Sequence, residues 1–231
     1  MPERHGEIIV AAGVNGAGKS TIIGQYARQN GAPYFNPDER THALVAAGLE
    51  PAQANARSWQ EGFAALRQAI DHNTAFIFET TLGGHSMVAE LLRALARGRP
   101  VTIYYVGLEG VDLHLRRVAA RVKRGGHDIP EDKIRERYRS SRENLMQFIG
   151  TRASLRVWDN SREDPAGLPN PVDVLTIEDG RLLYPHTAKA LMATPAWARP
   201  LVQRALEVCK LPAALKRATG QGPARRLRPV K

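Results

Sequence analysis

The sequence GVNGAGKS at residues 13–20 decides how the chain folds, because it matches the spacing G-x-x-x-x-G-K-[ST]. The apolar run EIIVAAGV at residues 7–14 leads into it, and residues 20–29 are expected to form a helix after it. A buried strand followed by a glycine-rich turn and a helix is the context in which this spacing holds phosphate. The sequence therefore predicts a P-loop that binds a nucleoside triphosphate.

Each residue type in this loop has a physical role. The glycines let the backbone pass close to a nucleotide, so that N–H groups point at phosphate oxygens, and the following helix adds unpaired N–H groups. Lys19 is expected to reach the β- and γ-phosphates and to act in catalysis, and Ser20 to ligate Mg²⁺. ATP and Mg²⁺ are therefore the predicted cofactors. The residues predicted to bind the nucleotide are Gly13, Asn15, Gly16, Ala17, Gly18, Lys19, Ser20 and Thr21.

Strands and helices alternate along the chain up to residue 159. Further strands are expected at residues 33–36, 75–79, 101–108 and 155–159, and helices at residues 38–47, 51–73, 86–97, 111–124 and 130–149. The helix over residues 51–73 is predicted from apolar side chains at helical spacing, which include Trp59 and Phe63. Asp179-Gly180 predicts the turn of a later hairpin. This order predicts an α/β, three-layer P-loop NTPase fold with a mainly parallel sheet.

The net charge of +10 is concentrated near the end of the chain. Residues 186–231 contain 10 of the 33 basic residues, and Glu207 is their only acidic residue. We therefore expect a P-loop kinase domain at residues 1–185 and a basic appendage at residues 186–231, with short helices and a disordered last dozen residues. The appendage could be a solvated tail, a docking surface for an acidic protein or a contact for nucleic acid.

Composition excludes several classes of protein. No run of 18 apolar residues is present, so a membrane span is not expected. The first residues do not read as a signal peptide. Cys209 is the only cysteine, which excludes an internal disulfide and a thiolate metal cluster. A cytoplasmic location is the expectation.

Other classes of P-loop protein need motifs that this sequence lacks. It contains neither the N-K-x-D motif of a GTPase nor the LSGGQ-type signature of a transporter ATPase. A small-molecule kinase needs a base near the acceptor hydroxyl, an acidic residue after a strand and an arginine-rich lid. Asp38, Glu79 and residues 117–138 supply all of these. The sequence therefore favours an ATP-dependent phosphotransferase with an alcohol group as acceptor.

Four sequence strings resemble the zeta toxin family of P-loop kinases, in its small stand-alone branch. They are FNPDE at residues 35–39, FETTLG at 78–83, RVAARVKRGGHDIPEDKIRERY at 117–138 and WDNS at 158–161. The resemblance covers about residues 7–162. It implies a kinase that phosphorylates a sugar hydroxyl of UDP-N-acetylglucosamine. It also implies a small antitoxin partner that blocks the ATP site.

The resemblance assigns roles to three residues that follow strands. Asp38 matches the catalytic base that faces the acceptor hydroxyl, and Glu79 and Thr81 match substrate-binding residues. Asp38 follows the second strand at the end where open α/β sheets bind ligands, which agrees with this role. Two alternatives stay open: Asp38 could cap the helix that follows it, and Glu79 could be a structural carboxylate.

Arginines form the predicted phosphate-binding lid. By resemblance, Arg124 and Arg137 are the two phosphate-clamping, catalytic arginines. Arg121 is a further catalytic candidate and Arg117 a nucleotide-binding candidate. Arg117, Arg121 and Arg124 recur at helical spacing, and residues 115–126 contain no acidic side chain. Such a helix face repels itself unless phosphate lies against it, although a solvated basic face is the alternative.

Two other functions are also compatible with the sequence. A polynucleotide 5′-kinase or a nucleotide kinase could use the lid or the basic tail to hold an acceptor phosphate. A binding module could use ATP turnover only to switch its conformation, without any small-molecule acceptor.

Overall fold

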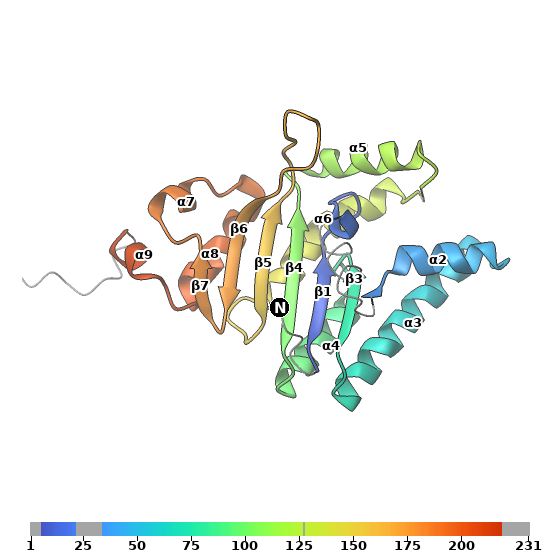
Figure 1. Cartoon of the computed structure of the whole chain (residues 1–231), viewed down its shortest axis with the longest axis horizontal. Helices are drawn as coiled ribbons and strands as arrows, with labels where there is room; N and C mark the ends of the chain where they lie inside the picture. Colours follow the sequence, from blue (N-terminus) through green and yellow to red (C-terminus); the bar gives the residue numbers. More distant parts are fainter. Residues whose placement is uncertain (1–5, 22–33, 127, 219–231) are drawn as a thin grey trace, which may run out of the picture.

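The computed structural model describes residues 6–21, 34–126 and 128–218. Its strands are β1 (Ile8–Ala12), β2 (Tyr34–Phe35), β3 (Phe76–Thr80), β4 (Val101–Gly107), β5 (Ser154–Asp159), β6 (Val172–Glu178) and β7 (Arg181–Tyr184). They form a seven-stranded sheet in the order β2-β3-β1-β4-β5-β6-β7, and Figure 1 labels every strand except β2. The first five strands of the chain pair with one another in parallel, whereas β6 is antiparallel to both of its neighbours, β5 and β7. The predicted α/β fold with a mainly parallel sheet is confirmed.

The sequence signals for the strands correspond to this arrangement. β1 lies between β3 and β4, and its residues are almost all buried, as the continuous apolar run at residues 7–14 predicted. Asp179 and Gly180 connect β6 to β7 with φ values of +50° and +69°. Both values suit the two-residue turn predicted for this hairpin.

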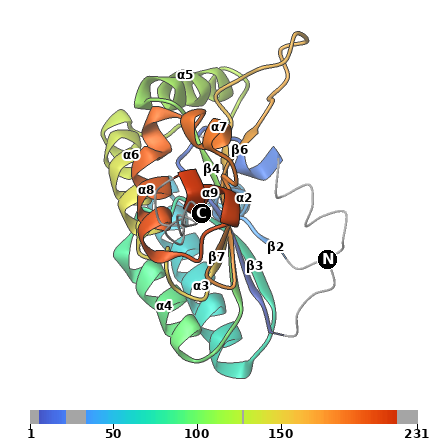
Figure 2. The same ribbon diagram turned by 90° about the vertical axis from the view of Figure 1, so that its left-hand side faces the viewer.

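The described helices are α2 (Pro37–Ala46), α3 (Pro51–His72), α4 (His85–Ala96), α5 (Val111–Val122), α6 (Glu131–Met146), α7 (Ala188–Met192), α8 (Arg199–Val208) and α9 (Ala213–Ala218). Figure 2 shows α3, α4, α6 and α8 on one face of the sheet. The helix predicted over residues 20–29 lies mostly outside the described residues, as do the last dozen residues. Within the described ranges, no helix is both long and apolar enough for a membrane span.

Described residues between positions 187 and 218 pack against the sheet. Trp197, Leu201 and Val202 belong to the same apolar cluster as the buried side chains of β4 to β6. The Trp197 ring lies so close to Gly107 that a Cβ there would be 2.2 Å from the ring. Its indole N–H donates a hydrogen bond to Asp159 Oδ1 (3.2 Å). The division at residue 185 stays a prediction, and these contacts offer a way to test it.

We expect Trp197→Ala to lower the free energy of unfolding by about 3–5 kcal/mol, because the indole is only 6% exposed and its removal leaves a cavity. Trp197→Phe should lower the free energy of unfolding by about 1–3 kcal/mol, because the buried Asp159 loses the hydrogen bond from the indole N–H. Urea unfolding measures both. Met192→Ala, at a side chain that is 85% exposed, is the control. Wild-type stability in Trp197→Ala would instead support an independent appendage.

Candidate active site

The P-loop depends on glycine at three positions. Gly16 and Gly18 have φ values of +81° and +94°, which L-residues rarely adopt. Gly13 lies against β4, where a Cβ would come within 2.2 Å of the Val106 carbonyl oxygen. The loop follows β1 at the carboxyl edge of the sheet, and Figure 1 shows α2, α5 and α6 around the same edge. Open α/β sheets bind their ligands at this edge.

Three side chains from other elements hold the loop in place. His114 on α5 contacts the Asn15 carbonyl oxygen through Nδ1 (2.9 Å), and Arg137 on α6 donates to Asn15 Oδ1 (2.9 Å). Asn160, which follows β5, donates to the Ala17 carbonyl oxygen (2.8 Å). Both helices of the predicted lid region therefore contact the same P-loop residue.

Glu79 forms the centre of a buried polar cluster. Its carboxylate lies 3.3 Å from Lys19 Nζ and accepts hydrogen bonds from Ser20 Oγ (2.8 Å) and Tyr34 Oη (2.6 Å). Burial by itself raises the pKa of Glu79, but the charge of Lys19 and the hydrogen bonds together outweigh it, so the pKa lies below its usual value. Glu79 is therefore a carboxylate, and it links the P-loop to β2.

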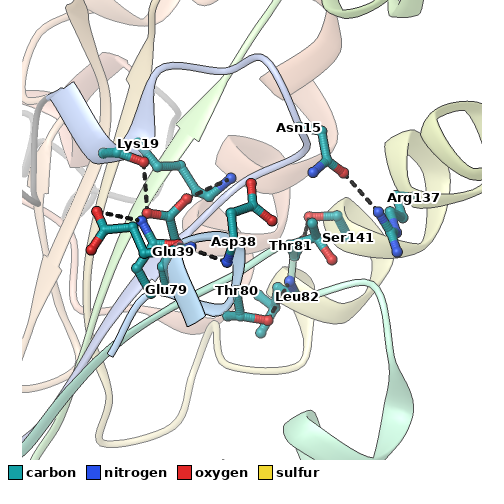
Figure 3. A network of polar contacts seen from close by, with 12 residues as sticks. Asn15, Lys19, Asp38, Glu39, Glu79, Thr80, Thr81, Leu82, Arg137 and Ser141 are labelled. Atoms are coloured by element: carbon teal, nitrogen blue, oxygen red, sulfur yellow. Dashed lines mark hydrogen bonds and ion pairs between the residues drawn. The ribbon is translucent and has the colours of Figure 1, made fainter. Parts of the chain in front are cut away.

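Asp38 lies in the first turn of α2, and the cap of that helix is a different residue. Asn36 Oδ1 accepts hydrogen bonds from the backbone N–H groups of Asp38 (2.9 Å) and Glu39 (3.4 Å). The alternative that Asp38 is the cap is therefore wrong. The Asp38 carboxylate lies 3.4 Å from Arg121 Nη1. Figure 3 shows its side chain between Lys19 and Arg137 in that view.

A cavity of about 370 Å³ brings together six of the predicted site residues, which are Asn15, Lys19, Asp38, Glu79, Thr81 and Arg137. The lining residues come from the P-loop, β2, α2, α3, β3, α4 and α6 and from the segments next to them. Burial lowers the pKa of the Arg137 guanidinium, and the nearby Asp38 carboxylate partly opposes this. An arginine stays positively charged under such conditions. The cavity thus places a lysine and an arginine beside a carboxylate.

The turn that carries Thr81 is fixed to α6. Ser141 Oγ donates to the Thr81 carbonyl oxygen (2.6 Å), and Asn144 Nδ2 donates to the Leu82 carbonyl oxygen (2.9 Å). The Thr81 hydroxyl oxygen accepts from the Gly83 N–H at 3.4 Å. Figure 3 shows this turn beside Arg137. The same helix therefore positions Arg137 and the Thr81 turn.

The four predicted lid arginines lie in different places. Arg121 contacts Asp38, and Arg137 lines the cavity. Arg117 lies next to the P-loop, with its Cβ 3.4 Å from the position of a Cβ on Gly16. Arg124 is exposed, and its Nε donates to the Ala120 carbonyl oxygen of its own helix. Because α5 ends at Val122, Arg124 leaves the helix face that its spacing predicted. The structure does not bring it to the cavity.

Sequence reasoning missed three side chains of this site. Tyr34 and His114 gave no signal, because a lone tyrosine or histidine is usually structural. Asn160 lies in the WDNS string, but the string assigned it no contact. Trp59, expected in an apolar helix stripe, is 49% exposed and lines the cavity. These positions follow from tertiary packing, which local patterns do not encode.

The buried His114 predicts a pH dependence of stability. Burial lowers its pKa from 6.5 to about 4, with smaller contributions of the same sign from Lys19, Arg117 and Arg142, and the bond to Asn15 opposes them. As the pH falls, the histidine of the unfolded chain therefore binds a proton before the buried His114 does. This group makes the free energy of unfolding about 3 kcal/mol higher above pH 6.5 than near pH 4, and that stability is lost as the pH falls between these values. His114→Asn keeps a donor but cannot titrate. Urea unfolding from pH 7 to 4 should show a smaller loss of stability in this variant, and an equal loss would contradict the prediction.

Comparison with known proteins places the fold and the site in a family. Residues 8–145, which include the P-loop, Asp38 and Arg137, match the family model AAA_33, described as an AAA domain. The chain belongs to this family. A protein of Haemophilus influenzae, described as uncharacterized, is 32% identical to this AAA domain protein over 130 residues, covering 56% of the chain and 91% of that protein.

Solved structures share the fold of this AAA domain protein. The AvrRxo1-ORF1:AvrRxo1-ORF2 complex with sulphate ions aligns with a TM-score of 0.58 and 13% identity, covering 92% of this chain and 79% of that chain. The AvrRxo1-ORF1:-ORF2 structure with ATP aligns with a TM-score of 0.59 and 15% identity, covering 86% and 63%. These values show a common fold.

Proposed function

We propose that the chain is an ATP-dependent kinase that transfers the γ-phosphate of ATP to a hydroxyl of a small molecule. The observation that carries this proposal is the shared cavity of the P-loop lysine and Asp38. A carboxylate near a P-loop suits an acceptor hydroxyl, and phosphoryl transfer needs little beyond positioning and charge stabilisation. The family and the fold support the proposal at the level of a kinase-like domain.

The proposed chemistry uses four side chains. Asp38 accepts a hydrogen bond from the acceptor hydroxyl and takes its proton as the oxygen attacks the γ-phosphorus. The bond from that phosphorus to the β–γ bridging oxygen breaks, and ADP leaves. Lys19 and Arg137 stabilise the charge on the transferring group. Arg121, which contacts Asp38, lies where it can hold that carboxylate or the phosphate.

The residues around Glu79 fit a magnesium ion. The Ser20 hydroxyl and the Glu79 carboxylate are hydrogen-bonded to each other, and both are the oxygen donors that Mg²⁺ prefers. Ser20 would ligate the ion and Glu79 would hold it directly or through water. When bound, Mg²⁺ neutralises charge on the phosphates. Glu79 would thus act on the metal side of the cavity, while the substrate-binding role first predicted for it stays a prediction.

The resemblance to zeta toxins supplies a lead acceptor and a partner. UDP-N-acetylglucosamine is the acceptor that the resemblance implies, and a small antitoxin is the implied partner. The AvrRxo1-ORF1 structures are also complexes with a second protein, AvrRxo1-ORF2. Co-purification with a neighbouring gene product would test the partner.

A panel of acceptors tests the proposed function. The full chain is incubated with γ-labelled ATP, Mg²⁺ and one acceptor at a time: UDP-N-acetylglucosamine, free sugars, nucleosides, nucleotides or a 5′-hydroxyl oligonucleotide. Label on a small-molecule hydroxyl is the expected result. Label only on the oligonucleotide would identify a polynucleotide kinase. ATP binding without transfer to any compound would favour the switch module.

A further inference from the structure

The part of the cavity lining that comes from β2 and α3 differs chemically from the rest of the lining. Lys19, Asp38, Glu79 and Arg137 are the charged groups among the described residues that line the cavity. The lining residues that come from β2 and α3 are Phe35, Asn55, Ala56, Trp59 and Gly62, and none of them is charged. An acceptor that reaches Asp38 therefore extends its remaining atoms along an uncharged, partly aromatic wall.

Trp59 is an unusual component of this wall. Its side chain is 49% exposed, although indole rings are mostly buried in folded proteins. It stacks on Phe63 with ring centroids 5.0 Å apart and an angle of 12° between the rings. Phe63 in turn packs against the main apolar core. Trp59 thus presents a half-exposed ring at the cavity, and Phe63 supports this ring by stacking on it.

The two cations among the described lining residues already have partners in or next to the P-loop. Lys19 forms an ion pair with Glu79, and Arg137 donates to Asn15. On α2, the nearby Arg40 is paired with Glu61 through Nε and Nη2. A phosphate or diphosphate is bound in proteins by arginine, lysine or clustered N–H donors. None of the described lining residues from β2 and α3 is a cation, and Arg57 of α3, which does not line the cavity, shares Glu61 with Arg40.

We propose that the acceptor is an uncharged molecule whose ring stacks on Trp59 while one of its hydroxyls faces Asp38, a proposal that rests on the kinase function proposed above. A sugar, a cyclitol or a nucleoside has this chemistry, because each combines hydroxyls with a ring that an indole can cover. Asn55 adds a neutral amide for a hydroxyl or carbonyl of the acceptor. This proposal favours a neutral acceptor over UDP-N-acetylglucosamine, the acceptor that the resemblance implies, and the experiment below compares the two.

The test uses the full chain and pairs of compounds that differ only in charge. Neutral monosaccharides, cyclitols and nucleosides are each compared with a phosphate or diphosphate derivative, N-acetylglucosamine and uridine being compared with UDP-N-acetylglucosamine. Calorimetry with a non-hydrolysable ATP analogue measures binding, and γ-labelled ATP measures transfer. We expect at least one neutral compound to bind and to be phosphorylated more efficiently than its charged derivative.

Variants at Trp59 separate ring stacking from a structural role. Trp59→Ala should raise KM for the neutral acceptor about tenfold, with kcat within twofold of wild type, because the ring contributes binding only. An acceptor that stacks on Trp59 should also quench its fluorescence. Trp59→Phe should keep most of the wild-type affinity for the acceptor and should abolish this quenching. Met192→Ala, at an exposed side chain outside the cavity, is the control. Thermal unfolding checks that each variant is folded.

The outcomes distinguish this proposal from the kinase function. If a charged compound is the better acceptor, if no neutral compound binds, or if Trp59→Ala leaves KM unchanged, the neutral-ring proposal is overturned while kinase activity can still stand. If ATP binds and no compound of either kind is phosphorylated, the kinase function itself fails.

Discussion

Replacing Asp38 by asparagine should lower kcat for phosphoryl transfer by about 10²- to 10⁴-fold, the range of general-base catalysis. The amide keeps the size of the side chain and cannot accept the hydroxyl proton. Asn36 provides the cap of α2, so the helix should not lose stability in this variant. ATP affinity should stay within about twofold, because in the structure Asp38 contacts Arg121 and not the P-loop.

Steady-state kinetics and ATP titration of the same protein measure these two quantities. Asp173→Asn on β6 is a matched control, since it makes the same chemical change at an exposed carboxylate outside the cavity. A variant Asp38→Asn that turns over at the wild-type rate would show that Asp38 only positions Arg121. A loss of ATP affinity equal to the loss of kcat would place Asp38 in nucleotide binding instead.

Replacing Lys19 by methionine should have two separable effects. Phosphoryl transfer should fall by about 10²- to 10³-fold, because one preorganised positive group is lost from the transition state. The free energy of unfolding should also fall by about 3–5 kcal/mol, since Glu79 is 7% exposed and loses its cation. The stability that Glu79 contributes through its lowered pKa is present at neutral pH and is lost in acid, as the pH falls through that pKa.

A double variant resolves these effects. Lys19→Met combined with Glu79→Gln removes both charges, so most of the lost stability should return while transfer stays low. Urea unfolding and labelled-ATP assays of the single and double variants give the comparison. Full stability in Lys19→Met would show that the buried pair is not formed without nucleotide. Recovery of transfer in the double variant would contradict the catalytic role of Lys19.

The fold could be predicted from the sequence because its signals are local. The apolar run of β1, the glycines of the P-loop and the Asp179-Gly180 turn each constrain the backbone where they occur. The helices and strands of the structure differ from the predicted ones by a few residues at their ends. In α6, for example, Met146 rather than Ile149 is the last helical residue. The alternation of strands and helices predicted a mainly parallel sheet, but it did not predict the order of the strands.

The site could be predicted only in part, because its geometry depends on contacts between distant elements. Asp38 and Arg137 gave a signal through their strings, and the structure places both at the cavity. Arg124 gave an equally strong signal, but the end of α5 at Val122 directs it to solvent. His114 gave none, and Trp59 was predicted only as a member of an apolar helix stripe, because burial of a histidine against Asn15 and exposure of an indole are properties of the packed molecule.

The most direct test of the central claim is to follow the γ-phosphate through an unfractionated extract of metabolites. The full chain, ATP and Mg²⁺ are added to the extract, and mass spectrometry identifies each compound that gains one phosphate, with Asp38→Asn in a parallel reaction. We predict a phosphorylated hydroxyl compound that forms in step with ADP in the wild type and not in the variant. Formation of ADP with inorganic phosphate alone, equal in the two proteins, would contradict the account.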